Sequence, residues 1–158
     1  MKPSPSLDRC RAWIIAAFVV ATLLAASIGG IFTPGAWYDA LAKPEWTPPG
    51  WIFGPVWALI YFLIAAAGVV AWDARSIRRR ALGWWATQMI LNAAWSWVFF
   101  GLHSPGLALA VIAVMLVSIV GFIRLSWRPA RLAAWLFMPY LGWVSFASIL
   151  NYSIVMMN

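Results

Sequence analysis

The sequence predicts an all-α membrane protein that folds as a bundle of five transmembrane helices. Of its 158 residues, 65% are hydrophobic and only 9% are charged, whereas soluble domains are about half apolar and about a quarter charged. The charged residues cluster at residues 2–11, 39–45, 73–80 and 124–131, and long uncharged runs separate these clusters. A membrane-spanning helix needs roughly 20 mainly apolar residues, and the runs supply five such helices.

The five spans account for most of the chain and leave only short connections between them. We place them at about residues 12–32, 51–72, 81–101, 107–125 and 131–154. The rest of the chain is then an N-terminal cytoplasmic tail (1–11), one long loop (33–50) and a C-terminal tail (155–158). Because no linker, soluble insertion or internal repeat is visible, residues 12–154 form a single transmembrane domain.

The first span, residues 12–32, follows a charged N-terminus and has two interpretations. A cleaved signal peptide also has a charged start, and Ala25-Ala26-Ser27 loosely resembles its cleavage site. The apolar run is too long for a typical signal core and continues to Phe32, which favours a spanning helix. Small residues at every fourth position predict a packing face against a neighbouring helix or a second subunit, and they are Ala17, Ala21, Ala25 and Gly29.

The distribution of basic residues predicts the orientation of the spans. Of the 11 Lys and Arg residues, only Lys43 lies in the first loop, and the others, beginning with Lys2, lie in the N-terminal tail and the second and fourth connections. Cytoplasmic loops carry an excess of Lys and Arg, so we expect the N-terminus in the cytoplasm and the C-terminus outside. This rule explains the basic residues without nucleic acid as a partner. A bacterial inner membrane is expected, since outer-membrane spanning proteins are usually barrels.

The third span, residues 81–101, carries polar residues at depth. Gln88, Asn92 and Ser96 are spaced by four residues and therefore share one helix face. Because an unsatisfied polar group in hydrocarbon is costly, this stripe predicts either hydrogen bonds between helices or contact with a ligand. For Asn92, near the middle of the membrane, the two interpretations are compatible.

The 13 tryptophans exceed the number that aromatic belts at the membrane interfaces explain. Most lie near helix ends or in the first loop, and the four that remain are Trp57, Trp95, Trp97 and Trp143. At 1.5 Å per residue, Trp57, Asn92 and Trp143 converge on the middle to outer half of a core about 30 Å thick. These residues predict a pocket at that depth.

Two helix faces and the long loop complete the predicted pocket. Trp57 shares a face with Tyr61, and Trp143 shares a face with Pro139 and Ala147. Pro139 removes a backbone hydrogen bond and should bend the fifth span, which opens space. The loop of residues 33–50 is rich in proline and tryptophan, so we expect it to form an ordered lid. A lidded aromatic pocket suits a planar hydrophobic ligand.

Residues 37–57, WYDALAKPEWTPPGWIFGPVW, strongly resemble the signature of the tryptophan-rich sensory protein family, also called the translocator protein or peripheral benzodiazepine receptor family. The segments LNAAWSWVFFG, PYLGW and LNY agree in order and spacing, so the resemblance covers nearly the whole chain. It implies a five-helix bundle in membrane lipid, frequently a homodimer, that binds porphyrins such as protoporphyrin IX or haem. The ligand-binding residues that it implies are Tyr38, Pro48, Trp57, Asn92, Trp95, Trp143 and Ala147.

Mitochondrial members of that family also bind cholesterol, and the fifth span departs from the pattern associated with this sterol. The pattern has a tyrosine followed by a nearby basic residue, but after Tyr152 this chain reads SIVMMN, with neither Lys nor Arg. Such patterns are weak even when complete. The missing cation argues against sterol recognition at this site.

Hydrolytic or acid–base catalysis has no visible set of residues in this sequence, because all four acidic residues lie near helix ends or in loops. His103, the only histidine, lies in the short third connection, which excludes deep axial ligation of a haem iron by histidine. The resemblance therefore leads us to expect a protein without a required cofactor that binds tetrapyrroles and regulates their level or signalling. Transport of tetrapyrroles or of lipid is an alternative. The resemblance adds a second alternative, which is light-dependent breakdown of bound protoporphyrin IX at Trp57 and Trp143.

Overall fold

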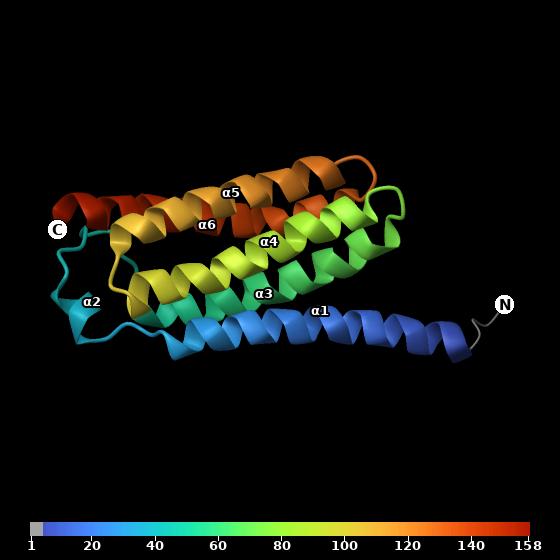
Figure 1. Ribbon diagram of the computed structural model, residues 1–158, viewed down its shortest axis with the longest axis horizontal. Coiled ribbons are helices and arrows are strands. Elements are labelled where there is room, and N and C mark those ends of the chain that lie inside the picture. The colour runs from blue at the N-terminus through green and yellow to red at the C-terminus, as the bar shows by residue number, and fades with distance from the viewer. Residues whose placement is uncertain (1–4) are drawn as a thin grey trace.

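The computed structural model describes residues 5–158, and every regular element in that range is helical. Lys2, which the orientation argument counts with the N-terminal tail, lies outside the described residues. The long helices run side by side along the longest axis of the molecule (Figure 1). They are α1 (Pro5–Ile31), α3 (Gly50–Asp73), α4 (Arg78–Ser96), α5 (Pro105–Ser126) and α6 (Arg131–Met157).

Two short elements complete the chain. Helix α2 (Ala36–Ala40) lies in the long loop, and η1 (Trp97–Gly101) is a π-helical turn that continues α4 without a break. Helix α4 and η1 together therefore occupy the segment predicted as the third span. Helix α1 begins at Pro5 rather than near residue 12, and α6 continues through Pro139 to Met157, so both predicted tails are largely helical.

Four helices in the described part of the chain are long and apolar enough to cross a membrane, and they make the chain an integral membrane protein. These segments are Arg9–Ile31, Gly50–Asp73, Pro105–Ser126 and Arg131–Met157. Helix α4 differs because it begins with arginines and carries Gln88 and Asn92. Both polar side chains are buried within the protein, so neighbouring helices rather than lipid surround them. Composition therefore identifies four spans, with α4 packed among them.

The bundle is closed by packing of α6 against α5 and α3, and of α4 against α5, with α1 outermost against α3 and α4 (Figure 1). Its most buried part is aromatic: the rings of Phe122 and Phe137 stack with their centroids 4.0 Å apart, and Tyr140 is fully buried beside them. A second contact fixes α4 to α3, since the Trp85 indole N–H donates to the Ile64 carbonyl at 2.9 Å.

The small residues of α1 face two environments. Ala25 is buried, and a Cβ added at Gly29 would lie 3.5 Å from the Ser96 hydroxyl of α4, whereas Ala17 is exposed. The predicted packing face therefore contacts a neighbouring helix in its second half. This helix is α4, in keeping with close backbone approach at small residues in membranes.

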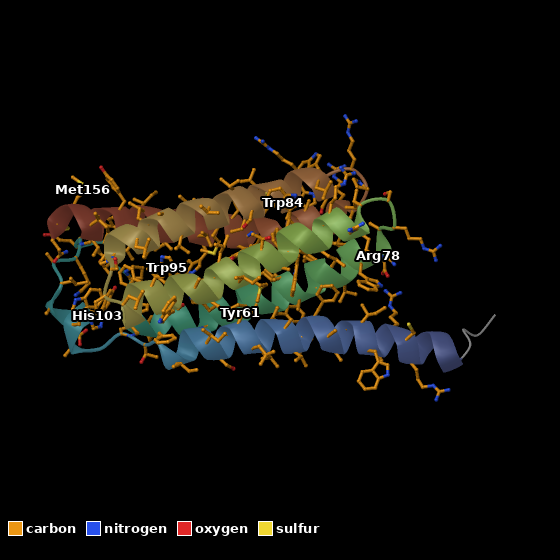
Figure 2. All side chains as sticks on the ribbon, in the orientation of Figure 1. Tyr61, Arg78, Trp84, Trp95, His103 and Met156 are labelled. Carbon is orange, nitrogen blue, oxygen red and sulfur yellow. The ribbon has the colours of Figure 1, made fainter. Side chains whose placement is uncertain are left out.

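The two ends of the molecule differ in charge. Nitrogen-tipped side chains gather at the end that carries Arg78 and the α3–α4 and α5–α6 connections, which we call the basic end (Figure 2). Helix α2, the connection with His103 and the end of α6 lie at the opposite end, the loop end (Figures 1 and 2). The cavity described next lies toward this loop end.

A candidate ligand pocket beneath the long loop

A cavity of about 990 Å³ lies between α1, α3, α4 and α6, under the long loop. This volume is at the upper end of the roughly 300–1,000 Å³ range of small-molecule sites. All the residues that the family resemblance implied line it: Tyr38, Pro48, Trp57, Asn92, Trp95, Trp143 and Ala147. The fold thus brings residues from four segments of the chain together around one space. That they bind a ligand stays a prediction.

The deep wall of the cavity contains a chain of hydrogen bonds across four helices. The Tyr61 hydroxyl donates to Asn92 Oδ1 at 2.7 Å, and Asn92 Nδ2 donates to the Tyr140 hydroxyl at 3.3 Å. Tyr140 in turn donates to the Met115 sulfur at 3.3 Å. A buried amide that is satisfied on both sides is held in one orientation. Asn92 therefore forms the predicted hydrogen bonds between helices and also lines the cavity, while its contact with a ligand stays a prediction.

The other members of the polar stripe divide between core and cavity. Ser96 lines the cavity. Gln88 is fully buried and does not line the cavity. Its Nε2 donates to the Trp85 carbonyl at 2.9 Å, and its Oε1 has no partner among the described residues. Periodicity correctly places these side chains on one helix face, but the surroundings of that face change along the helix axis.

The tryptophans of the cavity differ in how their indole N–H groups are used. The Trp95 N–H donates to Asn151 Oδ1 at 3.1 Å, and Asn151 Nδ2 donates to the Pro105 carbonyl at 2.8 Å. Within the described chain, no protein group accepts a hydrogen bond from the N–H of Trp57 or Trp143. A buried indole N–H usually has a partner. The indole N–H groups of these two rings are therefore available to donate a hydrogen bond to a bound ligand.

Aromatic neighbours pack against the indole rings of Trp57 and Trp143 and hold them in place. The Trp57 ring lies 5.4 Å from the Tyr61 ring and 6.3 Å from the Tyr140 ring, measured between centroids. Phe53 packs edge-on against Trp143 at 5.6 Å. Edge-to-face and tilted pairs at these separations are favourable because the ring edge is positive and the ring face is negative. The result is a pair of rigid aromatic surfaces around one space.

The long loop is tied down by two side chains. Lys43 Nζ donates to the carbonyls of Tyr38, Asp39 and Leu41 at 2.6, 3.1 and 2.9 Å, which uses all three of its donors. Asn158 pairs twice with the backbone of Ala42, accepting from its N–H at 3.0 Å and donating to its carbonyl at 3.0 Å. These bonds fold the loop over the cavity and attach it to the end of α6.

The loop makes its side of the cavity polar. Thr33, Asp39, Lys43 and Thr47 line the cavity there, in contrast to the aromatic residues further in. Burial, with a smaller contribution from the Asp39 charge, raises the pKa of Tyr38 above its usual value. Tyr38 therefore stays neutral at physiological pH. The cavity is amphipathic, with an aromatic interior and a polar rim.

Of the four tryptophans that the interface belts do not explain, Trp97 is not part of the cavity, and sequence reasoning missed the contribution of α1. Trp97 is 47% exposed and does not line the cavity. Its position two residues after Trp95 turns it toward another side of the helix. From α1, Thr22 and Leu23 line the cavity. Thr22 could have indicated this contribution from the sequence, because it is a hydroxyl residue within a long apolar run.

The same chain architecture occurs in known proteins. The sequence is 36% identical to Protein CrtK of Rhodobacter capsulatus over 148 residues, which cover 92% of each chain. It is 36% identical to the Tryptophan-rich protein TspO of Archaeoglobus fulgidus over 91% of this chain and 96% of the relative. It is 35% identical to the Translocator protein of Homo sapiens over 90% of this chain and 89% of the relative. Residues 17–157 match the TspO/MBR family, which confirms the resemblance, and the chain belongs to this family.

Proposed function

We propose that the protein is a membrane receptor that binds protoporphyrin IX-like tetrapyrroles in the cavity under the long loop and regulates their level or signalling. The observation that carries this proposal is the cavity of about 990 Å³ in which Trp57 and Trp143 keep unused N–H donors. A porphyrin is a flat apolar macrocycle with carboxylate side chains at one edge. The aromatic interior suits the macrocycle, and the polar rim with Thr33 and Thr47 suits the carboxylates.

The lining residues favour a metal-free macrocycle as the first ligand to test. No histidine lines the cavity, and the only one in the chain, His103, stacks on Trp37 in the loop region with ring centroids 4.3 Å apart. The Met115 sulfur already accepts a hydrogen bond from Tyr140. We therefore propose binding through stacking and hydrogen bonds, with haem as a possible ligand and no required cofactor.

Fluorescence-quenching titration with protoporphyrin IX tests ligand class and site together. We expect saturable quenching in the parent protein. Trp143→Ala removes a large stacking surface, so it should weaken binding about tenfold or more, which corresponds to about 1.4 kcal/mol. Trp97→Ala is the matched control, because Trp97 lies outside the cavity lining. Unsaturable quenching, or equal affinity in the two variants, would contradict the proposal.

Transport is the first alternative, and packing at the basic end argues against a continuous path. Below the cavity, Phe122, Phe137 and Tyr140 are fully buried and in ring contact. A porphyrin could pass only if these rings separated. Flux in proteoliposomes distinguishes the alternatives, since vectorial porphyrin movement that is lost in Trp143→Ala supports transport, and saturable binding without flux removes it.

Light-dependent breakdown of protoporphyrin IX is the second alternative. It is favoured by the presence of two indoles, Trp57 and Trp143, in the lining of one cavity, because an indole can donate an electron to an excited porphyrin. Oxidative ring opening would use dissolved O2 as the oxidant. Illuminated parent protein should then yield a defined bilin-like product. An unchanged rate of product formation in Trp57→Phe and Trp143→Phe would remove this activity.

The membrane arrangement that we propose has five spans, with α4 and η1 forming the third, in a bacterial inner membrane. The concentration of arginines at the basic end (Figure 2) supports a cytoplasmic position for this end, with the loop end outside. A homodimer is proposed on the family resemblance alone. Light scattering coupled to size-exclusion chromatography of the detergent-solubilised protein tests it directly.

A further inference from the structure

The cavity has a side opening between α1 and α3. Several of its lining residues also lie on the outer surface of the bundle. Leu23 on α1 is 59% exposed and Phe62 on α3 is 69% exposed. Ala58 and Gly54, one and two turns before Phe62 on the same face, are exposed lining residues as well. Residues that line a cavity and also face outward mark the rim of an opening.

The opening exists because the close contacts of α1 with α3 and with α4 differ along its length. Toward the basic end α1 touches α3, where a Cβ added at Gly68 would lie 2.4 Å from the Phe18 ring. At the same place Phe18 also packs against Trp85 of α4, with ring centroids 4.9 Å apart. Toward the loop end, Gly29 of α1 lies beside Ser96 of α4, and Phe32, the residue after α1, packs on η1. There a Cβ at Gly101 would lie 2.9 Å from the Phe32 ring. Contact with α4 therefore continues to the loop end, whereas Gly54, Ala58 and Phe62 in the loop-end half of α3 are exposed.

The loop side of the cavity is closed by several contacts. The three carbonyl contacts of Lys43 and the double pairing of Asn158 with Ala42 hold the loop. Trp37 stacks on His103 and lies edge-on to Phe99 at 5.9 Å. Opening this side would break all of these contacts. Between α1 and α3, by contrast, the exposed rim residues Leu23 and Phe62 carry apolar side chains.

We propose that ligands of this cavity enter and leave from the bilayer, through a portal between α1 and α3 bounded by Leu23, Ala58 and Phe62. This inference rests on the proposed function, because it concerns the route of the same apolar ligand. A planar hydrophobic molecule concentrates in lipid, and an apolar rim lets it pass without exposure to water. The portal residues control the rates of binding and release, while the residues deeper in the cavity control affinity.

The test measures protoporphyrin IX binding by stopped-flow fluorescence in proteoliposomes. Leu23→Trp narrows the portal and should lower kon and koff together by about tenfold, which corresponds to about 1.4 kcal/mol of added barrier, with Kd unchanged. Leu24→Trp is the matched control, because Leu24 is similarly exposed at 62% but does not line the cavity. Asn158→Ala loosens the loop and should leave both rates unchanged.

A variant that widens the portal should accelerate binding and release. Such an increase in rate would not be explained by misfolding. Phe62→Ala should raise both rates, whereas Leu59→Ala, on the same helix at 57% exposure and outside the lining, should not. The portal is overturned if Leu23→Trp and Phe62→Ala match their controls, or if Asn158→Ala accelerates entry. Absence of saturable quenching in the parent would instead remove the proposed function. In that case the binding and release rates of pyrene, a planar bilayer-soluble fluorophore, are measured in the same variants. The portal is then accepted or rejected by the same criteria.

Discussion

At the scale of single residues, the hydrogen bonds of Asn92 connect stability and binding. Its amide accepts from Tyr61 on α3 and donates to Tyr140 on α6, so one side chain joins three helices in the wall of the cavity. The same amide lines the cavity among aromatic residues. A substitution that leaves it unpaired affects both the bundle and the ligand, because a buried polar atom without a partner is costly.

Tyr61→Phe removes the donor to Asn92 Oδ1 and should destabilise the protein by about 1–3 kcal/mol. Tyr152→Phe is the matched control, since Tyr152 is exposed and makes no hydrogen bond with a described residue. Chemical denaturation in detergent, followed by tryptophan fluorescence, measures the difference. Equal stability of the two variants would show that the Tyr61–Asn92 bond does not contribute.

At the scale of helices, α1 is held by close contacts at two places along its length. Gly68 allows the Phe18 ring to reach α3, and Phe18 also packs edge-on against Trp85 of α4 at 4.9 Å. These contacts define where α1 crosses α3. They therefore also define how much of α3 remains open beside the cavity.

Gly68→Ala places a methyl group 2.4 Å from the Phe18 ring, and such overpacking should cost about 1–3 kcal/mol. Gly142→Ala is the control on α6, because nothing lies within 4 Å of an added Cβ there. We expect a lower thermal midpoint for Gly68→Ala and little change for Gly142→Ala. A midpoint for Gly68→Ala at or above that of the parent would contradict the tight α1–α3 contact.

The attachment of the loop to α6 can be measured at one amide. In Asn158→Ala, the Ala42 N–H loses its acceptor, so its hydrogen exchange should accelerate roughly two- to tenfold, as expected for one net hydrogen bond. The Thr47 amide, which donates to the Pro44 carbonyl at 3.0 Å within the same loop, serves as the internal control. Equal exchange of Ala42 in parent and variant would mean that the Asn158 contact does not hold the loop.

At the scale of the whole molecule, the two ends have different chemistry. The basic end holds the arginine-rich connections, and the loop end holds the polar rim of the cavity (Figure 2). Because positive charge is retained in the cytoplasm, the proposed orientation places the loop outside. A ligand in the cavity then lies closer to the outer face of the membrane.

Cys10, the only cysteine, is exposed near the beginning of α1 and reports this orientation directly. In intact cells, a membrane-impermeant maleimide should leave Cys10 unlabelled and should label it after permeabilisation. The reciprocal variant, Cys10→Ser with Glu45→Cys in the loop, should react in intact cells. Labelling of Cys10 without permeabilisation would reverse the proposed topology.

The sequence by itself determined the helical class, the positions of the long helices and the separation of charge. These features depend on local composition and on the length of apolar runs, which require no knowledge of neighbours. The family signature also named lining residues such as Trp57, Asn92 and Trp143, and the structure places them around one cavity.

Only the tertiary structure decided which helices meet at each face. Periodicity placed Gln88, Asn92 and Ser96 together, but their different surroundings depend on how α4 lies against its neighbours. The exclusion of Trp97 and the inclusion of Leu23 have the same origin. Helix period tells which side chains share a face, whereas the position of α1 against α3 and α4 depends on close contacts at Gly68 and Gly101 between segments far apart in the chain.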